Sequence, residues 1–375
     1  MSEHHDALGE LNKHIPLRER LITAHKSLSQ IFPFIARIAV TLYDPETRVL
    51  KTYLHSSDDT EPLEHYQTMI DDAPSLKKLL DKGLPRVINN MLTFGDDGHE
   101  HTARIGRKGY AASYTLPMFN ESEFFGFIFF NSSEKDVFTE HALSQIDVYG
   151  HMISLIIINE FATIRALAAA IKTTGHITHC RDPETGSHLD RMSRYSRLIA
   201  SAIAVKYDLD DDYIEHVFMY SPLHDIGKIA IPDEVLLSPN RLEKSEMEIM
   251  KTHARKGREM IDDLIMNFGL QNIDHIDILR NIAEYHHESV NGTGYPDGKS
   301  NDEIPLEARI VAVADVFDAL TSRRPYKEAW SNEMAISNLQ QLAGEKLDKD
   351  CVDALLDNMD EVLKIQQQFR EDRFG

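Results

Sequence analysis

The chain has 375 residues, more than one ordinary hydrophobic core accommodates, and its length fits two domains. It is 42% hydrophobic and 27% charged, as soluble globular proteins are, and no apolar stretch is long enough to span a membrane. The net charge of −21 repels polyanions and argues against DNA or RNA as a partner. Because the polar N-terminus lacks the apolar core of a signal peptide, we expect a cytoplasmic protein.

Cysteine and histidine are used very differently in this chain. The two cysteines, Cys180 and Cys351, are far apart and form no CxxC pair, so we expect ordinary thiols. The 19 histidines, in contrast, lie largely in short motifs of the second half. This clustering indicates metal ligands.

From about residue 35 to 130, short apolar runs alternate with turns. ARIAVTLY and RVLKTYLH flank a DPET turn, and GYAASYTLPMF and FFGFIFFNSS flank a turn at 120–123, so each pair predicts two adjacent strands. EPLEHYQTMI and PSLKKLLDKG have helical spacing. The first 150 residues are therefore predicted to be α+β with an antiparallel sheet.

Residues 140–175 are predicted to form one long helix. Their apolar run is interrupted by Asn159, Glu160 and Arg165, which argues against a membrane span. Two heptads have the alternating spacing of a coiled-coil seam, at Ile157, Phe161, Ile164, Ala168 and Ile171. We therefore expect a homodimer through this helix; the alternative is a helix packed on its own domains.

After residue 176 the strand signals give way to successive amphipathic helices, so the second domain is predicted to be all-α. Ser245 and Glu248 have the spacing of a capping box at one helix start. The apolar face that follows is formed by Met247, Met250, Ala254, Gly257 and Ile261.

Several pairs in this domain have the chemistry of metal ligands. Asp182 and Pro183 begin a predicted helix that places Glu184 and His188 one turn apart on one face. In SPLHDIGKIAIP, adjacent His224 and Asp225 in a helix would point in different directions and could serve two metals, with Lys228 one turn later.

Three further segments add candidates. MKTHARKG contains His253, and AEYHHESVNGTGYP contains vicinal His286 and His287 before a glycine-rich turn. ARIVAVADVFDALTS is apolar enough to be a buried helix, yet it holds Asp315 and Asp318. A carboxylate in such a helix requires a metal, an arginine or several hydrogen bonds.

These motifs occur in one order: E-x3-H, HD-x-x-K, H-x3-G, HHE-x2-NGTGYP and AD-x-x-D-A-L-T-S-x-R-P-Y-K. Together they resemble the HD-GYP family, a branch of the HD phosphohydrolases, over roughly residues 165 to 360. The first 145 residues resemble a GAF domain, in the order of elements and in PSLKKLLDKGLPRVIN followed by YTLPMF and FFGFIFF. GAF domains bind small ligands or serve as dimerising scaffolds, and both roles stay open here.

The HD-GYP resemblance implies roles for individual residues. Asp225 would bridge a two-metal centre whose ligands are His224, Asp225, His253, His286, His287 and Asp315. Glu184 and His188 would add a third metal. Lys228 would contact the substrate phosphate, and Arg324 and Lys327 would be cations near the dinucleotide. Gly294, Tyr295 and Pro296 would form a loop beside the site.

Imidazole and carboxylate ligands suit iron, with manganese or zinc as alternatives. The resemblance implies that two or three such ions generate hydroxide for attack on phosphorus. Two departures from the family pattern affect the loop: Asn291 replaces the usual Asp, and Lys299, Ser300 and Asn301 replace Leu-x-Gly. No predicted metal ligand is lost, so hydrolysis is still expected. The loop that helps to shape substrate choice is altered, so the substrate could differ from that of the family.

We therefore expect a GAF-like sensor domain (1–145), a connecting helix (146–175) and an HD-GYP catalytic domain (176–375). The expected reaction in signal transduction is hydrolysis of cyclic di-GMP to pGpG, and to GMP if a third metal is held. One alternative substrate is cyclic GMP-AMP, since only base contacts differ. Another reading is a non-catalytic signalling module that binds a cyclic dinucleotide or a protein.

Overall fold

The computed structural model describes residues 6–13, 15–57, 66–91, 109–178, 186–268, 274–322 and 329–370. Residue contacts divide the chain into two compact units, Met1–Thr163 and Ile164–Gly375. The division falls inside one long helix, α4, which spans Glu140–Thr178. The domain boundaries expected after residues 145 and 175 stay a prediction.

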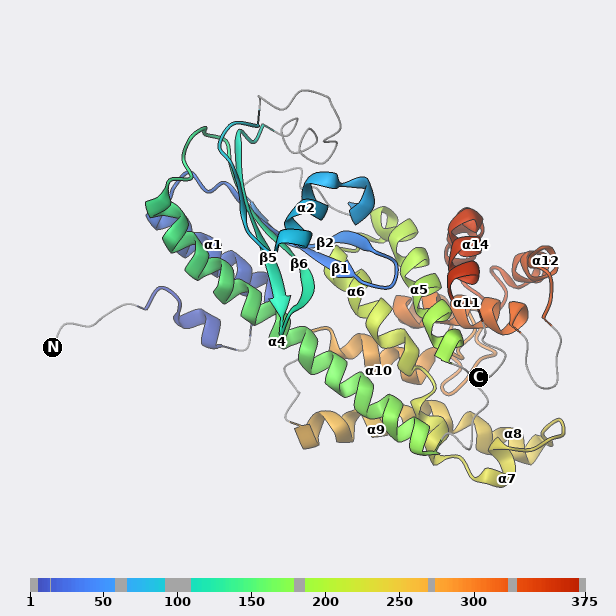
Figure 1. Cartoon of the computed structure of the whole chain (residues 1–375). Coiled ribbons are helices and arrows are strands. Elements are labelled where there is room, and N and C mark those ends of the chain that lie inside the picture. The colour runs from blue at the N-terminus through green and yellow to red at the C-terminus, as the bar shows by residue number, and fades with distance from the viewer. Residues whose placement is uncertain are drawn as a thin grey trace. The chain divides into compact units, whose positions relative to one another are not determined.

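The first unit contains a six-stranded antiparallel sheet with the order β3-β2-β1-β6-β5-β4 (Figure 1). Its strands are β1 (Arg37–Asp44), β2 (Val49–Ser57), β3 (Gln67–Met69), β4 (Arg86–Ile88), β5 (Ala112–Asn120) and β6 (Glu123–Ser132). Besides α4, its helices are η1 (Gly9–Asn12), α1 (Leu17–Ile31), η2 (Ile70–Asp72) and α2 (Pro74–Lys82). The predicted α+β architecture is confirmed.

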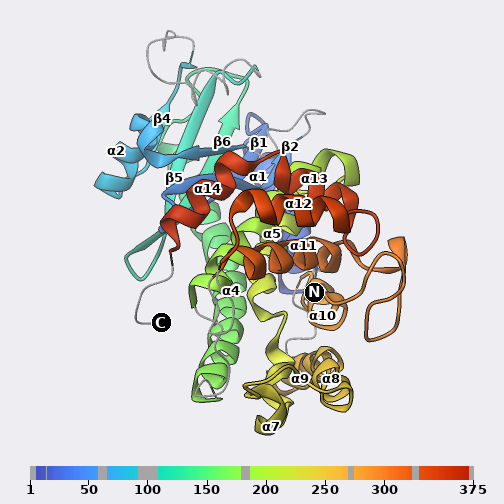
Figure 2. The same cartoon turned by 90° about the vertical axis from the view of Figure 1, so that its right-hand side faces the viewer.

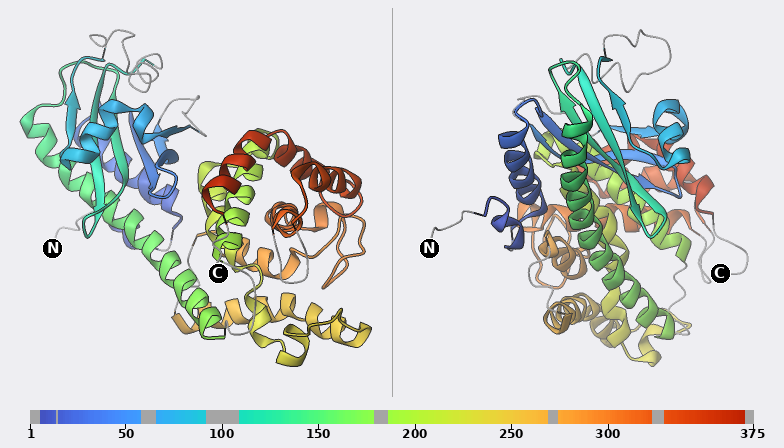
Figure 3. Two further views of the ribbon diagram at one scale, coloured as in Figure 1. Left: turned by 45° about the vertical axis from the view of Figure 1, so that its right-hand side comes forward. Right: turned by 60° about the vertical axis from the view of Figure 1, so that its left-hand side comes forward.

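Helices cover both faces of this sheet, with α1 and α4 along one face and α2 on the other (Figures 1 and 3). Successive side chains of β6 point to opposite faces of the sheet. Phe127 and Phe129 pack in one cluster with Leu76 and Leu79 of α2. Phe130 faces α4, where a Cβ on Gly150 would lie 2.5 Å from Leu116, so a glycine lets this helix approach the sheet closely.

Most predicted elements of this unit are present. Both strand pairs are confirmed, as is α2, which has Pro74 in its first turn and ends at Gly83 in the left-handed conformation. The helix expected in EPLEHYQTMI is wrong, because Gln67–Met69 pairs with β2 as strand β3. Residues 61–65 of that segment lie outside the described residues. Hydrogen bonding to a neighbouring strand overrides the local helical spacing here.

In the part that the structure describes, the regular elements of the second unit are all helices, as predicted (Figure 2). Its α-helices are α5 (Gly186–Tyr207), α6 (Asp211–Tyr220), α7 (Asp233–Leu236), α8 (Lys244–Lys251), α9 (His253–Phe268), α10 (Ile276–Tyr285), α11 (Leu306–Thr321), α12 (Asn332–Leu342), α13 (Lys349–Leu356) and α14 (Met359–Gln368). Three short 3-10 helices join them: η4 (Ser221–Leu223), η5 (Ile226–Ala230) and η6 (Asn301–Glu303).

Helix α11 lies in the core of this unit, beside α5 and α10. Ile310, Val311, Val313 and Phe317 are fully buried and pack with Met192, Tyr195 and Ile199 of α5 in one cluster, while Leu306, Val316 and Leu320 are partly buried. This confirms the predicted buried helix. At its first turns, buried Arg309 contacts Asp348 at 2.7 Å, so this buried charge is paired.

The predicted start of α8 is wrong by two residues. Glu243 is the N-cap and Glu246 completes the capping box, while Ser245 lies within the helix. Because α8 ends at Lys251 and α9 begins at His253, the predicted apolar face is interrupted. Of the residues of this predicted face, Met247 is 40% exposed, whereas Ala254 and Ile261 are at most 1% exposed.

Part of the predicted coiled-coil seam on α4 is buried by other side chains of the same chain. Ile157, Phe161 and Ile164 are at most 3% exposed, and the Phe161 ring contacts Tyr53 and Phe125. The side chains of Ala168 and Ile171 lie outside the described residues. Among the described residues, no helix has the length and apolarity that crossing a membrane requires.

Candidate metal centre

Five segments of the second unit bring the predicted ligands together. His188 comes from α5, His224 and Asp225 lie between η4 and η5, and His253 begins α9. His286 caps the C-terminus of α10, with His287 next, and Asp315 lies on α11. Their possible ligand atoms form two groups, each within 4.8 Å: Asp225, His253, His286 and His287; and His188, His224 and Asp315.

Three imidazoles surround the Asp225 carboxylate. Its Oδ2 lies 3.1 Å from Nε2 of His224, and its Oδ1 lies 3.1 Å from Nε2 of His253 and 3.5 Å from Nε2 of His286. On the Oδ2 side, Lys228 Nζ lies at 2.7 Å. Since the His224 and His286 rings are 5.1 Å apart, Asp225 is placed where its two oxygens could serve both groups.

The tautomers of these imidazoles favour a cation. Nδ1 of His224, His253 and His286 lies 2.8–3.0 Å from the backbone carbonyl of Ser221, Met250 and Ile282, respectively. A carbonyl can only accept, so each Nδ1 donates and a neutral ring keeps its lone pair on Nε2. Nε2 and the carboxylate oxygens would then be facing acceptors. A metal ion between them removes the repulsion, and histidine ligands are commonly oriented in this way.

Protonation of the rings is the other way to remove this repulsion, and burial opposes it. Burial lowers the pKa of His286, and burial together with the neighbouring His286 holds the pKa of His287 well below its usual range. For Asp225, burial would raise the pKa, but Lys228 and His224 hold it well below normal. At neutral pH, His286 and His287 therefore offer neutral imidazoles and Asp225 offers a carboxylate, the forms that bind metals.

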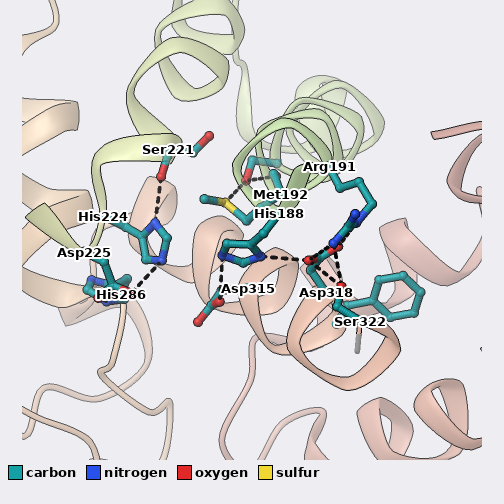
Figure 4. Close-up of polar contacts among 12 residues, drawn as sticks. His188, Arg191, Met192, Ser221, His224, Asp225, His286, Asp315, Asp318 and Ser322 are labelled. Carbon is teal, nitrogen blue, oxygen red and sulfur yellow. Dashed lines mark hydrogen bonds and ion pairs between the residues drawn. The ribbon is translucent and has the colours of Figure 1, made fainter. Parts of the chain in front are cut away.

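The second group is held by a buried carboxylate on α11 (Figure 4). His188 Nδ1 donates to Asp318 at 2.7 Å, while its Nε2 lies 3.9 Å from Asp315 Oδ1. Arg191 makes two hydrogen bonds to Asp318, of 2.6 and 2.9 Å, and a third of 2.6 Å to Ser322. A buried carboxylate here was expected to have a metal, an arginine or several hydrogen bonds. Asp318 has the arginine and the hydrogen bonds.

The backbone around the HD pair differs from the expected helix, since His224 and Asp225 lie between two short 3-10 turns. Gly227 allows this packing: a Cβ there would lie 1.9 Å from the carbonyl oxygen of His253. The close contact between η5 and α9 brings His253 to Asp225. Any side chain at position 227 would separate them.

The loop after His287 is fixed by the preceding glutamate. Glu288 is 5% exposed, and its Oε1 accepts from the backbone N–H groups of Asp297 and Gly298, at 2.7 and 3.0 Å. A Cβ on Gly294 would lie 2.3 Å from the backbone nitrogen of Ser289, so this glycine permits a close approach. These contacts leave the Tyr295 ring 4.8 Å from His287, next to Pro296 and beside the candidate ligands.

The altered loop residues make contacts of their own. Asn291 Oδ1 accepts from the backbone and hydroxyl of Thr293 at 3.1 and 2.6 Å, as a carboxylate oxygen would. Ser300 forms a capping box with Glu303 at η6, and Lys299 Nζ lies 5.0 Å from the centre of the Tyr285 ring. The loop therefore has internal contacts of its own, and the half-buried Lys299 adds a positive charge to it.

Some predicted residues lie outside the described part of the chain, namely Glu184, Arg324 and Lys327. Sequence reasoning did not single out Arg191 and Ser322, which hold Asp318. One signal was available for Arg191, which lies three residues after His188 and therefore shares its helix face. Ser322 had a similar signal, since it lies four residues after Asp318, to which its hydroxyl donates at 2.9 Å.

Comparison with known proteins identifies the class of this unit. Residues 184–351 match the family model described as an HD domain. The second unit of the chain is therefore an HD domain, and the histidines and aspartates described above lie within the matched residues.

The similar proteins with curated names include enzymes acting on cyclic dinucleotides. The cyclic di-GMP phosphodiesterase response regulator RpfG of Xanthomonas campestris is 45% identical over 210 residues, covering 56% of this chain and 51% of the relative. The 3'3'-cGAMP-specific phosphodiesterase 2 of Vibrio cholerae is 32% identical over 254 residues, covering 64% and 47%, respectively. The chain thus spans about half the length of these relatives.

Among solved structures, the GAF domain/HD domain protein from Geobacter sulfurreducens is similar with a TM-score of 0.32 and 16% identity. The match covers 38% of this chain and 93% of that one.

Proposed function

We propose that this chain is a metal-dependent phosphodiesterase that hydrolyses cyclic di-GMP to pGpG. The observation that carries the proposal is the pair of adjacent His/Asp groups, in which Asp225 contributes to one and its neighbour His224 to the other. The orientation of the imidazoles by backbone carbonyls supports it further.

Each side chain then has a task in phosphoryl chemistry. Bound divalent ions would supply a nucleophile at neutral pH and charge stabilisation at phosphorus. Asp225 holds both groups at a fixed separation, and Lys228 presents a positive charge beside it, suited to the phosphoryl oxygens. Asp318 and Arg191 keep His188 in one orientation.

The donors are imidazole nitrogen and carboxylate oxygen, which suit iron, manganese or zinc, and iron is the first candidate of this proposal. Glu184 and His188 would allow a third ion, and with it further hydrolysis to GMP. His188 Nε2, 3.9 Å from Asp315, supports this part of the proposal.

Cyclic GMP-AMP is the second candidate substrate, because three curated relatives are named 3'3'-cGAMP-specific phosphodiesterases. Arg324, Lys327 and the loop of Gly294, Tyr295 and Pro296 would contact the dinucleotide. The half-buried cation Lys299, in the altered part of the loop, would influence which base is preferred.

The test is chromatography of products after purified protein, reductively loaded with iron or manganese, is incubated with each dinucleotide. We expect pGpG, or pGpG followed by GMP, from cyclic di-GMP. Faster turnover of cyclic GMP-AMP would make that dinucleotide the preferred substrate in place of cyclic di-GMP. Absence of product from both, in protein that contains metal, would reject the enzymatic proposal in favour of a binding module.

We further propose that the chain works in the cytoplasm, that its first unit is a GAF-like sensor that accepts a small-molecule ligand, and that two copies associate through α4. Val148 and Leu155, one heptad apart on that helix, are 66% and 68% exposed. They are better placed for a partner than the buried Ile157 and Phe161.

A further inference from the structure

A third group of metal-binding side chains lies at the opposite end of α10 from His286. It consists of Asp212 and His216 on α6 and His275, the N-cap residue of α10. We propose that this group binds a divalent metal ion of the zinc type, separate from the candidate catalytic centre.

The three side chains are close enough to share one ion. Their possible ligand atoms lie within 4.8 Å of one another. His275 Nε2 lies 3.1 Å from Asp212 Oδ2, and the centres of the His216 and His275 rings are 4.7 Å apart. Although His275 is an N-cap residue, its side chain makes no capping hydrogen bond, so it is available to this group.

His216 is oriented like the histidines of the candidate catalytic centre. Its Nδ1 donates to the backbone carbonyl of Asp212 at 2.8 Å, four residues earlier, as that of His286 donates to Ile282. A neutral His216 therefore keeps its lone pair on Nε2, which is buried and makes no hydrogen bond. A buried acceptor without a donor costs free energy unless a cation or another donor satisfies it. A metal ion would do so.

The surroundings favour a cation and leave a path for it. Asp210 and Asp274 add negative charge near His275. Burial alone would raise the pKa of Asp212, but His216 and His275 hold the pKa of this carboxyl well below normal. Asp212 and His216 are 5% and 1% exposed, whereas the His275 side chain is 34% exposed. A two-imidazole, one-carboxylate set with one solvent-facing member suits zinc or similar ions, with water completing the coordination.

A metal here would act on the architecture of the candidate catalytic centre. It would tie the N-terminus of α10 to α6, while the C-terminus of the same helix carries His286. The ten residues of α10 span about 15 Å, so the two sites share one short rigid element. We infer a structural ion that sets the position of α10, without contact with substrate.

The experiment measures zinc stoichiometry by equilibrium dialysis with Zn²⁺ and elemental analysis, on the full chain and three variants. His275→Ala removes the exposed ligand and is least disruptive to folding, and His216→Gln is the second test variant. His151→Ala, an exposed histidine on α4, is the matched control. We expect one fewer zinc per chain, or at least about 10-fold weaker binding of one equivalent, in the two test variants only.

A background carrying Asp225→Ala, His253→Ala and His224→Ala, which removes ligands from both groups of the candidate catalytic centre, separates this site from it. In that background we expect one zinc equivalent to remain, to disappear on adding His275→Ala, and circular dichroism to be unchanged. Equal zinc binding with and without His275→Ala would overturn the proposal and make the group a buried ion pair. This outcome does not depend on whether the chain hydrolyses a dinucleotide.

Discussion

At the scale of single residues, Asp225 and Lys228 have separable tasks although their side chains are 2.7 Å apart. Lys228 has no lone pair to offer a metal while it is protonated. Lys228→Ala should therefore keep its bound metal yet lose about 10²–10³-fold in kcat, the usual effect of removing one stabilising donor. Steady-state turnover with elemental analysis checks this. Asp225→Ala should lose both metal and turnover, and full activity in that variant would contradict the site assignment.

Asp318 is predicted to act through His188 and Arg191. Asp318→Asn leaves buried Arg191 without its charge partner, which should cost about 3–5 kcal/mol of stability. It should also weaken metal binding about 10–100-fold, because His188 loses its orienting acceptor. Urea unfolding and metal titration measure the two effects. Asp353→Asn, which breaks an exposed pair with Lys349, is the control and should change stability by at most about 1 kcal/mol.

At the scale of elements, the contact between η5 and α9 decides whether the centre can assemble. Gly227→Ala should destabilise the second unit by about 1–3 kcal/mol or more and reduce bound metal, because the new methyl group would meet the His253 carbonyl. Denaturant unfolding and elemental analysis measure both. Gly186→Ala, where nothing lies within 4 Å, is the control. Equal stability of the two variants would show that this close contact is dispensable.

The proposed association through α4 is tested on the same scale. Leu155→Asp places a charge on an exposed apolar position and should shift the dimer toward monomer in light scattering at micromolar concentration. Val205→Asp, which places the same charge on a 91% exposed apolar side chain outside this helix, is the control and should leave the molar mass unchanged. A monomeric wild-type chain would reject the dimer altogether.

At the scale of the whole molecule, metal binding should stabilise the second unit selectively. Metal at 100 times its dissociation constant adds about 2.7 kcal/mol. For a unit of this size the corresponding rise in Tm is about 5–10 °C. Calorimetry of chelated and metal-loaded protein checks this. In the first unit, whose described residues contain no such metal-binding group, any separate transition should stay in place.

The two-part architecture, and most of the side chains that the structure brings together in the candidate metal centre, could be predicted from the sequence. Alternating apolar runs, helical periodicity and the buried character of ARIVAVADVFDALTS depend on neighbours in the chain, so local pattern determines them. The histidines and aspartates were recognisable because their motifs occur in one order. The positions of Glu184, Arg324 and Lys327 lie outside the described residues, and their roles stay predictions.

Only the tertiary structure decided which side chains face one another. Gln67–Met69 became a strand because β2 offers it hydrogen bonds, and Phe161 became buried because Tyr53 and Phe125 pack against it. Arg191 reaches Asp318 across 127 residues, and His275 reaches Asp212 across 63. Such long-range pairs depend on how helices pack, and a linear pattern of residue types carries no information about the distance between two packed helices.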